Sequence, residues 1–188
     1  MKPKSIPEVV FSIGHSTRSI EEFIALLQAH GVRQLIDIRT APGSRKYPQF
    51  NSDALARSLR AAGIAYEHMP GLGGFRKAAP DSPNTGWKNA SFRGYADYMQ
   101  TEEFEGFLDE FIRAAAGKPT AMMCSEAVPW RCHRSLVADA LTVRGIPVEH
   151  IMSPTRRDRH ELKSFARVHG TRIEYPPEED STSLFDKD

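Results

Sequence analysis

The stretch Val9-Val-Phe-Ser-Ile-Gly-His-Ser16 decides the fold class. Its mostly apolar first half is as long as a typical strand and predicts one that is buried. Ser19 and Glu22 then form a capping box, and helical spacing relates the apolar residues after it, which are Ile20, Phe23, Ile24 and Leu27. A buried strand that leads straight into an amphipathic helix is the repeating unit of α/β proteins.

The same order recurs along the chain. Further strands are predicted at Gln34–Arg39, Ile64–Met69, Thr120–Cys124 and Val148–Met152. Amphipathic patterns between them predict helices after Asn51 or Ser52, after Thr101 and from Ser135 to Arg144. The predicted fold is therefore α/β: a single-domain, mostly parallel five-stranded sheet with helices on both faces, a Rossmann-like three-layer arrangement.

The length of 188 residues suits one domain with short appendages. Residues 1–8 are interpreted as an N-terminal tail and residues 9–170 as the domain, with one more helix over the basic stretch 156–167. A Gly- and Pro-containing stretch at 70–93 lacks periodicity and is expected to be a mobile loop. The acidic segment 171–188 is expected to be a partly disordered tail.

Composition narrows the classes of function. The formal net charge is +1, so charge alone neither demands nor excludes a polyanionic partner. The N-terminal residues lack an export signal, and no apolar run approaches the roughly 20 residues that span a bilayer. We therefore expect a cytoplasmic protein without a membrane partner, in which the two cysteines are reduced. Cofactors and oligomeric state receive no prediction.

Each predicted strand is followed by a side chain that can take part in chemistry. Ligands of α/β folds bind beyond the carboxyl ends of the strands, so these side chains are expected to meet at one edge of the sheet. They are His15 and Ser16, Asp37 and Arg39, His68, Cys124 and Glu126, and His150. Asp37 and Arg39 point to the same face of their strand, so they also suit a structural ion pair.

The segment Cys124-Ser-Glu-Ala-Val-Pro-Trp-Arg-Cys-His-Arg134 concentrates the reactive groups. Cys132, His133 and Arg134 are expected on the first turn of a helix, where the helix dipole and arginines stabilise a thiolate and bind anions. The predicted catalytic residues are His15, Cys124, Glu126 and Cys132. The predicted ligand-binding residues are Ser16, Asp37, Arg39, His68, Arg131, His133 and Arg134.

These residues predict an enzyme that acts on an anionic small molecule, such as a nucleotide or a sugar phosphate. His15 would move a proton, the loop 70–93 would close over the site, and Cys124 or Cys132 would be the nucleophile or a positioning group. A phosphatase-type loop fits poorly. Such a loop has an arginine six positions after its cysteine, but six positions after Cys124 is Trp130, and the arginine follows one position later at Arg131.

Three alternatives stay open at this point. One is a metal site built from Cys124, Cys132 and histidines, although Cys-x7-Cys is not a usual zinc spacing. Another is a non-catalytic module that binds nucleic acid through residues 156–167 and the loop 70–93, with Trp87 and Trp130 stacking on bases. The third is a thiol redox switch between the two cysteines.

Several segments together resemble an uncharacterised family, the domain of unknown function 488. The matching pieces are Ile13-Gly-His-Ser16, Asp37-Ile-Arg39 with Pro42 and Ser44, Phe50-Asn51, Tyr66-Glu-His68, Leu72-Gly-Gly74, Phe92-Arg-Gly-Tyr-Ala-Asp-Tyr-Met99, Cys124-Ser-Glu126 and Cys132-His-Arg134. Ser125 stands where relatives carry alanine, which leaves the thiol and carboxylate in place. The resemblance implies a bacterial or archaeal cytosolic α/β domain, and it supplies no activity.

Overall fold

The central sheet has six strands in the order β3-β2-β4-β1-β5-β6 in the computed structural model, which describes residues 6–178. Its first five strands in the chain are parallel, which confirms the predicted α/β class. They are β1 (Val10–Gly14), β2 (Gln34–Asp37), β3 (Ala65–His68), β4 (Thr120–Cys124) and β5 (Val148–Ser153). Every residue of β1, β2 and β4 is buried, as expected for strands covered on both faces.

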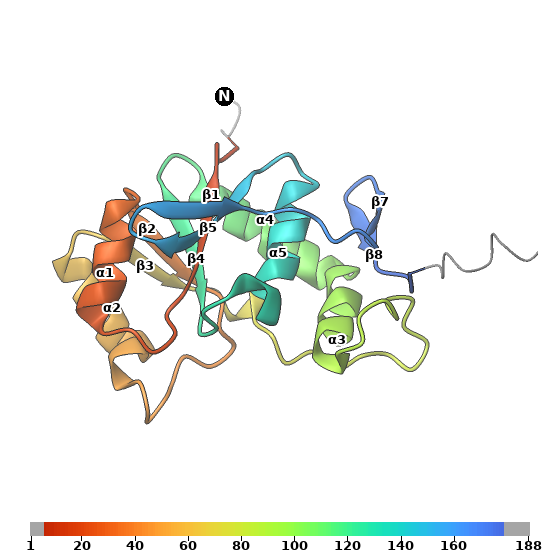
Figure 1. Ribbon diagram of the computed structural model, residues 1–188, viewed down its shortest axis with the longest axis horizontal. Helices are drawn as coiled ribbons and strands as arrows, with labels where there is room; N and C mark the ends of the chain where they lie inside the picture. Colours follow the sequence, from red (N-terminus) through yellow and green to blue (C-terminus); the bar gives the residue numbers. More distant parts are fainter. Residues whose placement is uncertain (1–5, 179–188) are drawn as a thin grey trace, which may run out of the picture.

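Helices form the outer layers on both faces of the sheet (Figure 1). On one face α1 (Ile20–Ala29) and α2 (Ser52–Ala61) pack against the sheet through Phe23, Leu27 and Leu55. The other face is covered by α4 (Glu102–Ala115) and α5 (Arg134–Thr142), and α3 (Ala90–Met99) packs against these two helices and extends their apolar core beyond the sheet. Two separate apolar cores thus lie on opposite faces of one sheet, and the three-layer prediction is confirmed.

Capping residues start two helices as the sequence predicts. The Ser19 hydroxyl accepts from the Glu22 amide, and the Glu22 carboxylate accepts from the Ser19 amide. The Thr101 hydroxyl accepts from the Phe104 amide at the start of α4. No helix among residues 6–178 has the length and apolar character that crossing a bilayer requires.

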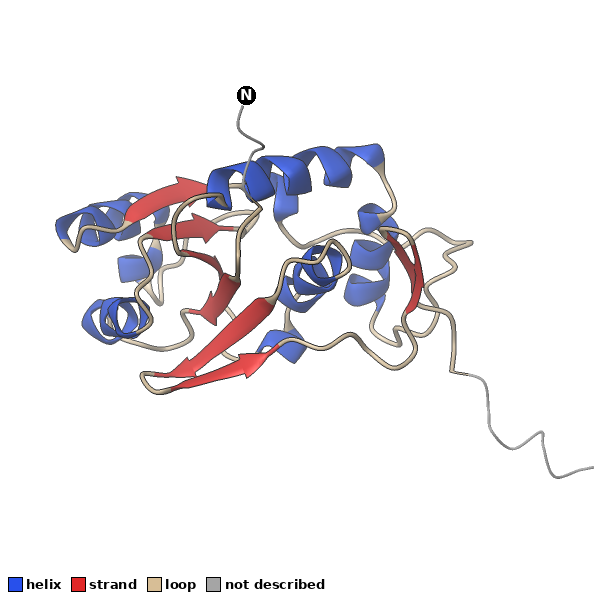
Figure 2. Cartoon of the chain, turned by 90° about the horizontal axis from the view of Figure 1, so that it is seen from above, coloured by secondary structure: helices blue, strands red, loops and turns tan. Residues whose placement is uncertain are grey.

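The prediction of a helix over residues 156–167 is wrong. Residues Arg156–Arg159 form β6, an antiparallel edge strand that makes a hairpin with β5 (Figure 2). The short strand β7 (Arg167–His169) follows. Charged pairs hold this edge, because Arg156 bonds Asp158 on its own strand and Arg157 bonds Glu149 across the hairpin. Hydrophobic periodicity cannot reveal a strand built from charged residues.

The segment assigned to a C-terminal tail is ordered over its first part. Residues Arg172–Glu174 form β8, which pairs with β7 beside α3 at the end of the molecule farthest from α1 and α2 (Figures 1 and 2). Ile173 and Tyr175 are buried in the apolar core to which α3 and α4 also contribute. Residues 1–5 and 179–188 lie outside the described part of the chain.

The loop 70–93 begins with a short 3-10 helix, Pro70–Leu72, and leads into α3. Side chains of α3 hold it at several points. Tyr95 donates to the Leu72 carbonyl and Tyr98 to the Gly71 carbonyl, each over 2.7 Å. Asp97 accepts from the Ala79 amide, the Ser82 hydroxyl and the Asn84 amide group. Movement of this loop stays a prediction.

Candidate functional site

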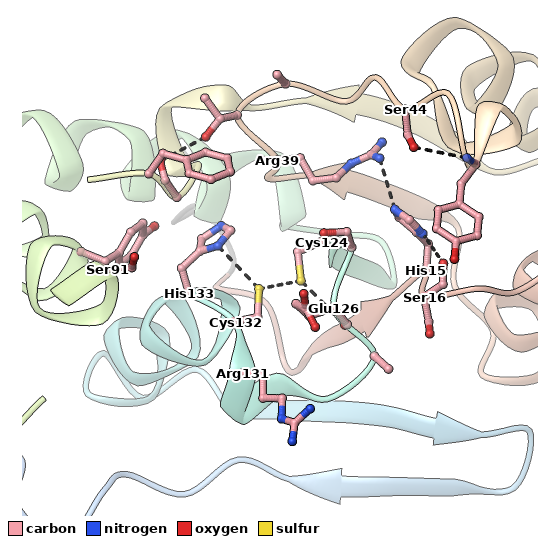
Figure 3. Close-up of a pocket in the computed structure, with 18 of the residues that line it drawn as sticks. His15, Ser16, Arg39, Ser44, Ser91, Cys124, Glu126, Arg131, Cys132 and His133 are labelled. Carbon is pink, nitrogen blue, oxygen red and sulfur yellow. Dashed lines mark hydrogen bonds between the residues drawn. The ribbon is translucent and has the colours of Figure 1, made fainter. Parts of the chain in front are cut away.

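The candidate site lies at the carboxyl ends of β1 and β4, two neighbouring strands whose following helices lie on opposite faces of the sheet. β1 leads to α1 on one face, whereas its neighbour β4 leads to α5 on the other. In α/β folds such a switch point leaves a crevice beyond the carboxyl ends of the strands. A cavity of about 710 Å³ opens there. Eight of the eleven predicted site residues line it: His15, Ser16, Arg39, Cys124, Glu126, Arg131, Cys132 and His133 (Figure 3).

Backbone hydrogen bonds join the chain at the ends of β1 and β4. The His15 amide donates to the Cys124 carbonyl over 3.0 Å, and the Ser16 amide donates to the Ser125 carbonyl over 2.9 Å. Gly14 allows this approach, because a Cβ atom there would lie 1.6 Å from the Glu126 carbonyl oxygen. This close contact places the histidine after β1 and the thiol after β4 on the wall of the same cavity.

Cys124 has the environment of a thiolate. Its Sγ lies 2.7 Å from Arg134 Nη1 and 2.6 Å from the Sγ of Cys132, which donates to it. Arg134 is 1% exposed and forms no ion pair with a carboxylate among the described residues, so the sulfur is the anion that its guanidinium meets. Burial raises the pKa of Cys124, but the Cys132 hydrogen bond and the Arg134 charge outweigh it and lower the pKa to about 7.

Cys132 remains a protonated thiol. Its hydrogen bond to Cys124 and its burial raise its pKa well above the ordinary value. The expected first helical turn at Cys132 is wrong, because α5 begins at Arg134. The Arg134 backbone amide still donates to Cys132 Sγ over 3.4 Å, but its guanidinium contacts Cys124. Cys124 thus has the lower pKa of the two thiols.

His133 sits beside Cys132 as a neutral base. Its Nε2 lies 3.3 Å from the Ile38 carbonyl oxygen, which can only accept, so Nε2 carries the hydrogen and Nδ1 is free to accept. This Nδ1 lies 3.5 Å from Cys132 Sγ. Burial lowers the pKa of His133 to about 4, so the ring is uncharged at neutral pH.

His15 is also buried and neutral. Its Nδ1 donates to the Ser16 carbonyl over 2.8 Å, so the lone pair is on Nε2, 3.4 Å from Arg39 Nη1. The ring stacks on Phe50 with centroids 4.3 Å apart. Burial is the main cause that lowers the pKa of His15. The residue fits the role of a proton acceptor that packing holds in place.

Asp37 and Arg39 form the expected ion pair. Two guanidinium nitrogens of Arg39 bond the two carboxylate oxygens of Asp37 over 2.9 and 2.7 Å, and the Tyr66 hydroxyl donates to the same carboxylate. Arg39 also donates to the Phe50 carbonyl. Asp37 is fully buried beneath the cavity, so it positions Arg39 and does not line the site itself.

Two of the side chains expected at the shared edge lie elsewhere. His68 is exposed on the edge strand β3, where its Nε2 donates to the Arg39 carbonyl. His150 lies in a second, smaller cavity of about 190 Å³ together with His160. There the two imidazoles bond each other, and His160 bonds Asp139, which accepts from Tyr175. Neither His68 nor His150 lines the main cavity.

Sequence reasoning missed much of the cavity rim. The loop 40–47 and the start of α3 contribute Ser44, Tyr47, Asn89, Ser91 and Phe92, and the end of the Gly-rich turn contributes Phe75. Phe75 is 94% exposed and has a φ of 60°, which is unusual for a residue other than glycine. Ser44 and Phe92 lie in segments of the family resemblance, but the sequence does not reveal that these rim residues meet, because they come together only through the fold of three separate loops.

The metal and nucleic-acid alternatives gain little from the arrangement. Among residues 6–178 no three His, Cys, Asp or Glu side chains group in a way that could hold a metal ion. Trp87 stacks with Phe92 and packs on Tyr175, so it belongs to the core rather than to a base-binding surface. Trp130 remains 55% exposed and lines the smaller cavity.

Fold and site together define an α/β protein of the three-layer type, with a thiol pair at the switch point of a mostly parallel sheet. The chain belongs to the family described as the domain of unknown function DUF488, whose family model matches residues 19–141. The match includes Arg39 and both cysteines and ends within α5. No curated protein matches the chain. No solved structure matches it either.

Proposed function

We propose that the main cavity is the active site of an enzyme that acts on an anionic small molecule, such as a nucleotide or a sugar phosphate, with Cys124 as the nucleophile. The observation that carries the proposal is the 2.7 Å contact between Cys124 Sγ and Nη1 of the buried Arg134, at the wall of a cavity large enough for such a substrate. A volume of about 710 Å³ is within the usual range of ligand pockets.

The lining of the cavity favours an anion. It contains two arginines, Arg39 and Arg131, whereas Glu126 is the single carboxylate among its described lining residues. Arg131 is exposed, and its guanidinium points away from the two sulfurs, so it suits a group bound at the rim (Figure 3). Hydroxyl groups that can bond a phosphate or a sugar surround them: Ser16, Thr17, Thr40, Ser44, Ser91 and Ser125.

Cys124 and His15 supply complementary chemistry. The Cys124 thiolate attacks the electrophilic atom of the substrate, and the leaving group departs with the bonding electron pair. Neutral His15 then takes a proton from the water or other acceptor that releases the bound group from the sulfur. The pKa of about 7 for Cys124 makes the thiolate available near neutral pH.

The nucleic-acid alternative loses its main support in this structure. Two of the arginines in residues 156–167 pair with acidic neighbours, Arg156 with Asp158 and Arg157 with Glu149. These residues form an edge strand and a loop, so they do not present one continuous basic helix face.

Binding of matched anionic and neutral molecules tests the proposal. We expect inorganic phosphate, ribose 5-phosphate and AMP to raise the thermal midpoint more than ribose and adenosine do. Arg131→Gln should weaken this effect, and Arg57→Gln on the exposed face of α2 serves as the matched control. Cys124→Ser should keep the binding and lose turnover. Equal effects of the charged and neutral molecules, or no effect of any of the anions, would contradict the proposal.

A further inference from the structure

The two cysteines of the chain meet at the main cavity. Cys124 ends β4 and Cys132 precedes α5, and their sulfurs are 2.6 Å apart as free thiols. The sequence contains no other cysteine. Closing the gap to a disulfide bond of about 2.0 Å therefore needs only a small approach of the two sulfurs.

The pair has the asymmetry that thiol redox chemistry requires. Cys124 faces the Arg134 guanidinium and accepts the hydrogen bond of its neighbour, whereas Cys132 donates that bond and lies beside the free Nδ1 of His133. One sulfur is thus poised to attack as a thiolate, and the other is placed to attack the oxidised product.

We propose that Cys124 and Cys132 form a redox-active dithiol that reduces a small hydroperoxide in the main cavity and becomes a disulfide. The redox partner must be a molecule that enters the cavity, because Cys124 is only 1% and Cys132 only 6% exposed and both line the cavity wall. A disulfide of another protein cannot enter it to reach these sulfurs, whereas a small hydroperoxide can. This redox activity does not depend on the identity of the anionic substrate proposed above.

The reaction balances in two steps. The Cys124 thiolate attacks one peroxide oxygen, the O–O bond breaks, and the leaving alkoxide or hydroxide takes a proton from water, so Cys124 becomes a sulfenic acid. Cys132 then attacks the Cys124 sulfur, and the S–O bond breaks. The proton of the Cys132 thiol passes to the departing hydroxide, which leaves as water. The two thiols supply the two electrons, and an external small thiol restores the dithiol.

The same step would switch off the enzyme proposed above. In the disulfide Cys124 has no free thiolate, and Arg134 loses the anion that balances its buried charge. Reduction by an external thiol would return both. The dithiol would therefore make activity on the anionic substrate sensitive to peroxide.

Titration of the full chain with hydrogen peroxide tests the proposal. One equivalent should lower the thiols counted after denaturation from two to none and leave the protein monomer mass smaller by two hydrogen atoms. Trypsin cuts after Arg131, so the non-reduced digest should contain two peptides joined by the disulfide, and a reducing agent should separate them. The denatured chain is the control, and it should react at least about 10-fold more slowly, because its thiols are mostly protonated.

Single variants assign the two roles. Cys132→Ser should stop at the sulfenic acid of Cys124, which dimedone labels, and Cys124→Ser should react no faster than the denatured chain. The proposal is overturned if the oxidised wild type keeps both thiols, if it forms only intermolecular disulfides, or if Cys124→Ser reacts as fast as the wild type. Circular dichroism of each variant separates loss of reactivity from loss of folding.

Discussion

Arg134 Nη1 lies 2.7 Å from Cys124 Sγ and 2.9 Å from the Glu126 carbonyl oxygen. A buried guanidinium without a partner would be strongly destabilising, so the first residue of α5 and the last residue of β4 stabilise each other as an ion pair. The chemistry of the thiol and the packing of the switch point therefore depend on the same contact.

Replacing Arg134 should change the titration of the thiol. Arg134→Met keeps much of the side-chain volume and removes the charge, so we expect the pKa of Cys124 to rise from about 7, because the guanidinium no longer opposes the effect of burial. The ultraviolet absorbance of the thiolate against pH measures it. Arg131→Met, an exposed change on the same loop, is the control. An unchanged pKa in Arg134→Met would show that the charge has no influence on the sulfur.

The ionised thiol should also make stability depend on pH. The pKa of Cys124 is about 7 in the folded protein against 9.0 ordinarily, so the folded state loses its proton first, and stability rises with pH between these values. Relative to Cys124→Ser, the free energy of unfolding of the wild type should rise by about 2 kcal/mol from pH 7 to 9. Urea unfolding of both proteins at a series of pH values measures this rise. A difference in the free energy of unfolding that does not change with pH would contradict the ion pair.

Gly14 should tolerate no larger residue. A Cβ atom at this position would overlap the backbone carbonyl of Glu126, whose oxygen lies at 1.6 Å, and it would lie 3.0 Å from Arg134 Nη1. Gly14→Ala should therefore cost about 3 kcal/mol or more of stability and separate the ends of β1 and β4. Gly43→Ala is the matched control, because a Cβ there meets nothing within 4 Å. Equal midpoints of urea unfolding for the two variants would contradict the close packing at the switch point.

Buried neutral histidines should destabilise the protein in acid. Burial, followed by the His160 charge, lowers the pKa of His150 to about 3, whereas its ordinary value is 6.5. Below pH 6.5 the unfolded chain takes up a proton that the folded protein does not, so stability falls as the pH falls. At pH 5 this one residue accounts for about 2 kcal/mol.

The variant His150→Gln isolates this contribution. Its free energy of unfolding should fall less steeply between pH 6.5 and 5 than that of the wild type, by about one proton in the slope. The exposed His169→Gln is the control. If His150→Gln and the wild type have the same slope in urea unfolding, the imidazole already binds its proton in the folded state.

The strands and the location of the site follow from the sequence because buried strands and helix caps are local patterns. The run 120–124 coincides with β4, and the capping box at Ser19 starts α1 where expected. The rule that ligands bind at strand carboxyl ends then places His15 and Cys124 at one cavity. These inferences need only the period of apolar residues and the chirality of the connections.

The parts that could not be predicted depend on partners distant in sequence. The strand β6 consists of charged residues, which pair with neighbours such as Glu149, so it shows no alternation of apolar residues. The contact of the Arg134 guanidinium with Cys124 depends on how α5 packs on the sheet. His160 is held between Asp139 and His150, which belong to two other elements. Side-chain protonation in such a network follows from three-dimensional contacts, not from spacing.

The protein should be less stable with Phe75 at the cavity rim than with a glycine at the same position. Its φ of 60° is costly for a side chain with a Cβ atom, and at 94% exposure the ring buries almost no apolar surface in return. We expect Phe75→Gly to raise the free energy of unfolding by about 1 kcal/mol. Phe75→Ala removes the ring but keeps the unfavourable φ, so it should leave stability within about 0.5 kcal/mol of the wild type. Equal stabilities of the two variants in urea would mean that the backbone at this turn relaxes without cost.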